Sequence, residues 1–235
     1  MILGVTALVR PLDVRARVVW REMPLMLLVT LALYPLAWDG VLSRGDGVLL
    51  LFALVAYLIF VFYSVEDEAP EILGEYEEFM KESDRTTSLV SGTDVLWVIA
   101  GSVCLVLGGI CIVEGAVEIA SSLGISEVVI GLTVVAVGTS LPELATSLVA
   151  ALRSEADIAV GNVIGSNIFN VAAILGTASV VSPLAIPSHV LTRELVVVVA
   201  MSLLLFPILR TGWRIRRWEG ALLLACYVGA VTWLL

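Results

Sequence analysis

Residues 138–143, GTSLPE, interrupt an apolar block that runs from about 126 to 151. Pro142 cannot donate a backbone hydrogen bond and disfavours helical geometry in the residue before it, and Gly138 weakens the helix further. The sequence therefore predicts a helix that breaks near Pro142, frees carbonyl groups in the preceding turn and starts again as a second half-helix. Within a membrane, such a break is tolerated only where the backbone is buried in protein or lines a cavity.

Glu143 lies at the predicted break. A carboxylate near the middle of a bilayer costs roughly 3 kcal/mol on insertion scales, so such residues are functional by default. The structural alternative is a protonated Glu143 that hydrogen-bonds as a latch between helices. We interpret Glu143 as a functional residue and keep the latch as the alternative.

A second polar stretch, GNVIGSNIFN, covers residues 161–170. Asn162, Ser166 and Asn170 recur every fourth residue, so they form one polar stripe on a helix. Asn and Ser side chains also join membrane helices by hydrogen bonds. This packing role explains Asn162 and Asn167 better than it explains a whole stripe beside a broken helix.

Two glycines of the same stretch predict close helix packing. Gly161 and Gly165 have the spacing that lets another backbone approach a membrane helix. Roles in helix packing or in support of the polar site are therefore predicted for Gly138, Pro142, Gly161, Asn162, Gly165 and Asn167.

The composition indicates a membrane protein. The 235 residues are 60% hydrophobic and 15% charged, with a mean hydropathy of +1.04, whereas soluble chains are about 45–50% apolar and about 25% charged. This excludes a soluble enzyme, a secreted disulfide scaffold and a basic nucleic-acid binder. We predict an all-α polytopic membrane protein with a partial helix over residues 1–9 and about seven full spans, at 23–38, 47–63, 93–121, 126–151, 157–181, 194–210 and 217–235.

The basic residues predict the orientation. Of 13 Lys and Arg residues, 11 fall on one side of the predicted spans and only Arg44 and Arg193 on the other. Short loops rich in Lys and Arg stay in the cytoplasm. The chain is therefore expected in the cell membrane, with loops 10–22, 64–92, 152–156 and 210–217 cytoplasmic and the C-terminus outside. The acidic run in 64–92 is read as a solvated linker or surface helix, with a regulatory cation site as the alternative.

Residues 2–40 repeat as residues 174–212 at an offset of 172, with about thirteen identical positions among 39. The shared positions include Gly, Pro and Arg-Glu residues, which apolar composition alone does not produce. Loop 10–22 and its counterpart 182–193 fall on opposite sides of the predicted membrane. The two copies are therefore inverted, as in many secondary transporters whose sites lie near the midplane between repeats.

The polar residues favour hard cations. Carboxylate, amide, hydroxyl and backbone carbonyl oxygens are ligands typical of Ca²⁺ and Na⁺. No His or Cys joins the cluster, so a zinc or copper site is not expected. The sequence contains no Ser/His/Asp or Cys/His arrangement and no phosphate-binding glycine loop, so no enzymatic activity is predicted.

The two polar stretches resemble a known family. GTSLPELATS (138–147) and GNVIGSNIFN (161–170) are similar to the second of the two α-repeats of the sodium/calcium exchanger family, within the cation/calcium antiporter superfamily. The resemblance implies ten helices in two inverted halves, joined by a cytoplasmic loop. It divides this chain into residues 1–63, the remainder of the first half; residues 64–92, the loop; and residues 93–235, the second half with its α-repeat at about 126–181.

The resemblance also implies a set of cation ligands. Glu143 is the principal carboxylate shared by Ca²⁺ and Na⁺, and Ala136 matches a position where the family lends a backbone carbonyl. The remaining oxygen ligands implied are Thr139, Ser140, Ser166 and Asn170. Some family members carry Asp at the position of Asn170, so the stoichiometry and ion preference stay open. The transported Ca²⁺ and Na⁺ are the expected ligands, and no tightly bound cofactor is expected.

The first α-repeat of the family is expected before Met1 and has no counterpart in the sequence. The resemblance thus implies a Ca²⁺/Na⁺ antiporter in which this chain carries one of two half-sites. The alternatives are a misassigned start, a truncated or split membrane subunit that does not transport alone, with the N-terminal half as a separate partner chain, and a proton-coupled divalent cation antiporter.

Overall fold

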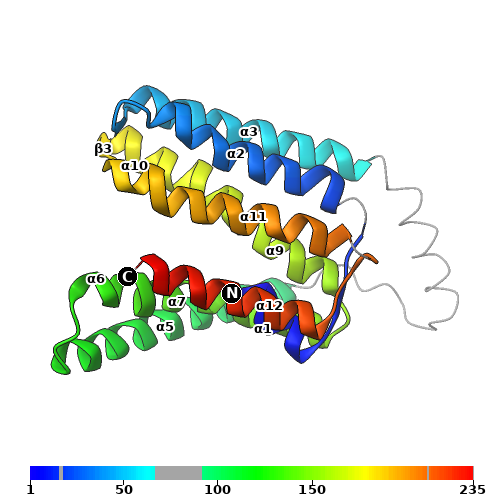
Figure 1. Cartoon of the computed structure of the whole chain (residues 1–235). Coiled ribbons are helices and arrows are strands. Elements are labelled where there is room, and N and C mark those ends of the chain that lie inside the picture. The colour runs from blue at the N-terminus through cyan, green and yellow to red at the C-terminus, as the bar shows by residue number, and fades with distance from the viewer. Residues whose placement is uncertain (16–17, 67–91, 211, 235) are drawn as a thin grey trace, which may run out of the picture.

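The computed structural model describes residues 1–15, 18–66, 92–210 and 212–234 (Figure 1). Most of the acidic segment 64–92 falls on residues 67–91 and lies outside the described residues. The elements run in the order α1 (Ile2–Val9), β1 (Leu12–Asp13), η1 (Val18–Glu22), α2 (Met23–Leu36), β2 (Val41–Leu42), α3 (Arg44–Glu66), α5 (Gly92–Ser122), α6 (Glu127–Ile130), η2 (Gly131–Val135), α7 (Ala136–Thr139), α8 (Leu141–Leu152), α9 (Ala156–Phe169), η3 (Asn170–Leu175), α10 (Gly176–Val181), β3 (Leu184–Ala185), η4 (Val190–Glu194), α11 (Leu195–Arg210), β4 (Arg214–Ile215) and α12 (Arg217–Leu234), where η marks π-helical turns.

The fold is that of a helical membrane protein, as predicted. Five helical runs are long and apolar enough to cross a membrane: Val18–Leu36, Arg44–Tyr63, Gly92–Ser122, Ala156–Val181 and Val190–Arg210. A bent pair, Thr133–Thr139 with Leu141–Leu152, is a sixth span when counted as one. Six of the seven predicted spans therefore meet this criterion of length and hydropathy among the described residues. The seventh, 217–235, forms α12, whose first turn carries Arg217 and Glu219 and lowers its hydropathy.

The internal repeat is present element by element. β1 and β3 begin at residues 12 and 184, η1 and η4 at 18 and 190, and α2 and α11 at 23 and 195, an offset of 172 each time. Gly40 and Gly212 then both adopt positive φ, at +83° and +76°. After this turn the offset is 173, which relates α3, starting at 44, to α12, starting at 217. The predicted repeat is confirmed.

The two copies are inverted and interlocked. β1 pairs antiparallel with β4, and β2 with β3, so each pair joins one strand from each copy. The equivalent strands β1 and β3 lie at opposite ends of the molecule (Figure 1). Because both ends are joined across the copies, neither copy separates from the other without breaking both strand pairs.

Helices from the two copies cross at very short distances where both carry glycine. A Cβ atom placed on Gly4 of α1 would lie 2.9 Å from the carbonyl oxygen of Gly220 in α12. In the equivalent crossing, a Cβ on Gly47 of α3 would lie 2.6 Å from the carbonyl oxygen of Gly176 in α10. Since a side chain would collide with backbone in both places, the two crossings need glycine.

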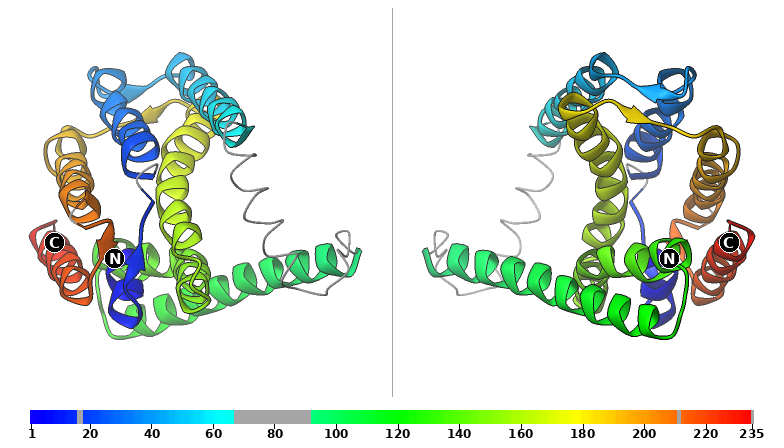
Figure 2. Two further views of the ribbon diagram at one scale, coloured as in Figure 1. Left: turned by 90° about the vertical axis from the view of Figure 1, so that its right-hand side faces the viewer. Right: turned by 90° about the vertical axis from the view of Figure 1, so that its left-hand side faces the viewer.

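The interior contains α9 and the segments around it. Ala159, Val160, Ile164 and Ile168 of α9 are buried in one apolar cluster with residues of α1, α2, α8 and α11. By contrast, the first part of α5 extends away from the other helices (Figure 2), and most of the large apolar side chains of α5 are exposed. This arrangement leaves α5 an apolar surface suited to lipid.

Candidate cation site

The predicted helix break is confirmed. The segments Thr133–Thr139 and Leu141–Leu152 meet at 47°. Between them, Ser140 leaves helical geometry, with φ −92° and ψ 2°, and caps α8, because its carbonyl accepts the N–H of Leu144 at 2.9 Å. Pro142 occupies the first turn of α8, where its missing N–H does no harm.

Hydroxyl groups bind the carbonyl that the break frees. The N–H of Ser140 donates to the carbonyl of Val137, three residues back, at 3.1 Å. The carbonyl oxygen of Ala136 instead accepts the Ser140 hydroxyl at 3.1 Å and the Thr139 hydroxyl at 3.3 Å. Three of the predicted ligands thus form one cluster of oxygen atoms at the end of α7.

Glu143, the third residue of α8, stands next to this cluster in the chain and is half-buried. Its Oε2 atom is fully buried and has no hydrogen-bond partner among the described residues. A buried carboxylate oxygen without a partner is unfavourable unless a proton, a donor or a cation satisfies it. The carbonyl end of a half-helix, here α7, favours a cation at such a break.

The polar stripe of α9 divides into two parts. Asn162 packs against α8, where its amide nitrogen donates to the carbonyl of Glu143 at 3.1 Å and to the hydroxyl of Ser147 at 3.0 Å. Further along, Ser166 is half-buried and donates to its own helix, while Asn170 is exposed at the start of η3. The packing role predicted for Asn162 is present, and the stripe beyond it keeps oxygen atoms open to a ligand.

The prediction of close packing at Gly161 and Gly165 is not met among the described residues. A Cβ atom added to either glycine finds no atom within 4 Å. The helices that cover α9 instead contact the face that carries Val160 and Ile164, both fully buried. The two glycines lie off that face, so their side of α9 is open in the described part of the chain.

Gly138 and Pro142 do pack against a neighbouring helix. Gly138 is buried, and a Cβ atom on it would collide with the side chain of Val113 in α5. One turn back along α5, a Cβ on Gly109 would lie 3.5 Å from the ring of Pro142. The glycines let α5 pack closely against the broken helix.

A cavity of about 400 Å³ borders the broken helix. It brings Ala136 and Ser140 together with Asn167 and with residues of α1, α2, α11 and α12. Sequence reasoning missed one buried polar residue nearby, Ser147, which is 0% exposed. The available signal was its position one turn after Glu143, on the same side of α8.

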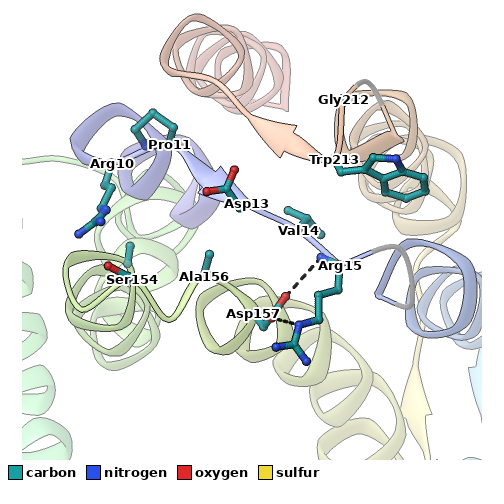
Figure 3. A pocket seen from close by; sticks show the side chains of 11 residues that line it. Arg10, Pro11, Asp13, Val14, Arg15, Ser154, Ala156, Asp157, Gly212 and Trp213 are labelled. Atoms are coloured by element: carbon teal, nitrogen blue, oxygen red, sulfur yellow. Dashed lines mark hydrogen bonds and ion pairs between the residues drawn. The ribbon is translucent and has the colours of Figure 1, made fainter. Parts of the chain in front are cut away.

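A second pocket, of about 460 Å³, lies where three loops meet (Figure 3). Arg15 pairs with Asp157 through Nε and Oδ2, 2.7 Å apart, and Arg10 donates to the carbonyl of Leu152 at 2.7 Å. Gly212 lines the same pocket. Loops that the basic residues assign to one side of the membrane therefore lie at one end of the molecule.

Comparison with known proteins agrees with this fold. The family model described as sodium/calcium exchanger protein matches residues 93–235. "Putative antiporter CaxA" of Alkalimonas amylolytica is 39% identical over 234 residues, which are 97% of this chain and 72% of that protein. "Inner membrane protein YrbG" of Escherichia coli K12 is 37% identical over 207 residues, 87% of this chain and 62% of that protein.

Solved structures of a sodium-calcium exchanger have the same fold as this chain. The sodium-calcium exchanger NCX_Mj soaked with Na⁺ and Ca²⁺ superposes with a TM-score of 0.73 at 32% identity, covering 99% of this chain and 70% of that one. The family model covers more than half of the 235 residues, and the match to CaxA extends over nearly all of them. This chain therefore belongs to the sodium/calcium exchanger family of membrane antiporters.

Proposed function

We propose that this chain takes part in the exchange of Ca²⁺ for Na⁺ across the cell membrane by alternating access, with Glu143 as the carboxylate for which the two ions compete. The observation that carries the proposal is the buried Oε2 atom of Glu143, which has no partner among the described residues and lies at a helix break. Oxygen atoms of Ala136, Thr139 and Ser140 stand beside the break. Such an all-oxygen set suits Ca²⁺ and Na⁺.

The names of relatives support the choice of ions. "Sodium/calcium exchanger MaX1" of Methanosarcina acetivorans is 44% identical over 79 residues, 34% of this chain and 23% of that protein. The ligand chemistry agrees, because one carboxylate among neutral oxygens serves a divalent ion or a monovalent ion. In the described residues no three His, Cys, Asp or Glu side chains cluster, so Glu143 would provide the charge of this half-site.

We further propose that a second half-site completes the pathway, from a segment outside these 235 residues or from a separate chain. The internal repeat supports this arrangement. Ala172 of η3 packs against Val29 and Leu54, and the repeat relates these two residues to Met201 and Tyr227. Met201 and Tyr227 line the cavity of about 400 Å³. A helix equivalent to η3 would cover them there.

The proposed orientation follows the basic residues, with the acidic segment 64–92 in the cytoplasm and the C-terminus outside. Arg10, Arg15 and Arg214 lie at the end of the molecule where β1 meets β4. The opposite end, where β2 meets β3, has Arg44 and Arg193 as its nearest basic residues in the sequence. An excess of Arg at one end favours the cytoplasmic side for that end.

Ion flux tests the function. Membrane vesicles from cells that express the gene in its genomic context are loaded with Na⁺ and diluted into K⁺ medium containing ⁴⁵Ca²⁺. We expect Ca²⁺ uptake that requires the Na⁺ gradient and that Glu143→Gln abolishes. Glu155→Gln makes the same chemical change at an exposed residue in the loop before α9 and should leave uptake unchanged.

Two outcomes would overturn the proposal. Uptake that persists in Glu143→Gln would remove the role of that carboxylate. Uptake that ignores Na⁺ but follows an imposed pH gradient would replace Na⁺ exchange with proton-coupled transport of a divalent cation.

A further inference from the structure

A polar pair, the buried Ser147 and the half-buried Asn162, joins α8 to α9 beside the candidate site. The hydroxyl of Ser147 donates to the carbonyl of Ala159 at 3.3 Å and accepts the amide of Asn162 at 3.0 Å. The same amide nitrogen donates to the carbonyl of Glu143 at 3.1 Å. Both hydrogens of the Asn162 amide are thus used, and both reach across from one helix to the other.

The surroundings make this pair well defined. Ser147 is completely buried, and it lies among Ala150, Ala151 and Ala159, which are at most 7% exposed. With so little space around Ser147, its hydroxyl has few alternative hydrogen-bond partners. The pair therefore sets the separation and register of α8 and α9 more sharply than apolar contacts alone, which tolerate sliding.

The hydrogen bonds of this pair lie close to the first turn of α8, which directly follows the helix break. A continuous helix would hold Glu143 in place through the preceding turn, but α7 and α8 meet at an angle of 47°. The hydrogen bond from Asn162 to the carbonyl of Glu143 holds the first turn of α8 on the side of α9, and α5 packs against the same turn at Pro142. This carbonyl belongs to the same residue as the buried carboxylate, so a shift of one moves the other.

We propose that Ser147 and Asn162 are positioning residues, which fix the carboxylate of Glu143 relative to Ser166 and Asn170 and make α8 and α9 move as one unit during transport. Neither residue touches the ion. The inference rests on the proposed function, because it assigns to the pair an effect on ion binding. A purely structural pair would change the amount of folded protein and leave the apparent affinity for Ca²⁺ unaltered.

The test measures ⁴⁵Ca²⁺ uptake against Ca²⁺ concentration in the same vesicles, normalised to the amount of protein in the membrane. For Ser147→Ala and Asn162→Ala we expect the half-maximal Ca²⁺ concentration to rise about tenfold, equivalent to about 1.4 kcal/mol. The maximal rate should fall less. The double variant should be little worse than Asn162→Ala, because both residues belong to one network.

Ser179→Ala is the matched control. Ser179 is also 0% exposed, but its hydroxyl donates within its own helix, to the carbonyl of Leu175 at 2.7 Å. Removing this hydroxyl should leave the half-maximal Ca²⁺ concentration within about twofold of the unmodified protein, since no contact between helices is lost.

Hydrogen exchange of the purified protein provides a readout that does not depend on transport. Ser147→Ala should speed exchange of the backbone amides in the first two turns of α8. Faster exchange with an unchanged half-maximal Ca²⁺ concentration would reduce the pair to a structural contact and overturn the positioning role. Unmodified vesicles that take up no Ca²⁺ would instead overturn the proposed function, and the positioning role with it.

Discussion

At the scale of single residues, the proposed cation site centres on a carboxylate placed where a helix is interrupted. Glu143 is the third residue of α8, so its negative charge lies near the positive end of that half-helix. The carbonyl end of α7 lies on the other side of Ser140 and attracts cations. The interruption therefore suits the proposed combination of a fixed anion and an exchangeable cation.

Asn170 offers a direct test of charge in the half-site. Asn170→Asp would add a second carboxylate at an exposed position on the stripe that contains Ser166. Because Ca²⁺ affinity in oxygen sites rises with ligand charge, we expect the half-maximal Ca²⁺ concentration to fall by about tenfold and Na⁺ to compete less well. The measurement is ⁴⁵Ca²⁺ uptake at several Na⁺ concentrations.

The same substitution at Asn167 serves as the comparison. Its amide donates to the carbonyl of Val163 on its own helix at 2.8 Å, and it is not among the predicted ligands. Asn167→Asp should therefore have the smaller effect. If the two variants changed the half-maximal Ca²⁺ concentration equally, Asn170 would have no special role as a ligand.

At the scale of elements, π-helical turns and glycine contacts decide how the helices fit. The turns η1 and η4 stand at equivalent places, before α2 and α11, and η2 and η3 flank the helices of the candidate site. Turns of this kind are rare and recur at functional sites. The broken helix then depends on α5, which contacts it through Gly109 and Val113.

The packing of α5 against the break can be tested at Gly138. Gly138→Ala would place a Cβ atom against the side chain of Val113, and overpacking of this kind costs about 1–3 kcal/mol. We expect a lower melting temperature in detergent, with recovery when Val113→Ala is added. Gly115→Ala on α5, where a Cβ meets no atom within 4 Å, should not lower it. Failure of Val113→Ala to restore stability would contradict this account of the contact.

At the scale of the whole molecule, the inverted repeat interlocks two copies that meet at both ends. The α1–α12 and α3–α10 crossings are equivalent under the repeat, and each pairs a helix from one copy with a helix from the other. Both ends of the molecule are therefore built from elements of both copies, which pair as β1 with β4 at one end and β2 with β3 at the other.

Inversion and orientation predict opposite accessibility for two engineered cysteines. After Cys104, Cys111 and Cys226 are replaced, Ser188→Cys should react with a membrane-impermeant maleimide from outside, because residue 188 follows β3. Glu155→Cys, in the loop between α8 and α9, should react only in inside-out vesicles. Labelling of both cysteines from one side would contradict the inverted arrangement, and a swapped pattern would reverse the proposed orientation.

Local chemistry and repetition can be read directly from the amino-acid sequence. Pro142 together with Gly138 favours a break in the helix around them, the apolar blocks indicate a membrane, and the offset of 172 reveals two copies. The tertiary structure decided how these parts meet: the pairing of α1 with α12, the hydrogen bonds between Ser147 and Asn162, and the open side of Gly161 and Gly165. A helix break or a membrane span depends on residues that are neighbours in the sequence. The contacts between helices depend instead on surfaces that folding brings together from distant parts of the chain. The spacing of two glycines in the sequence therefore does not reveal whether their side of the helix contacts another helix.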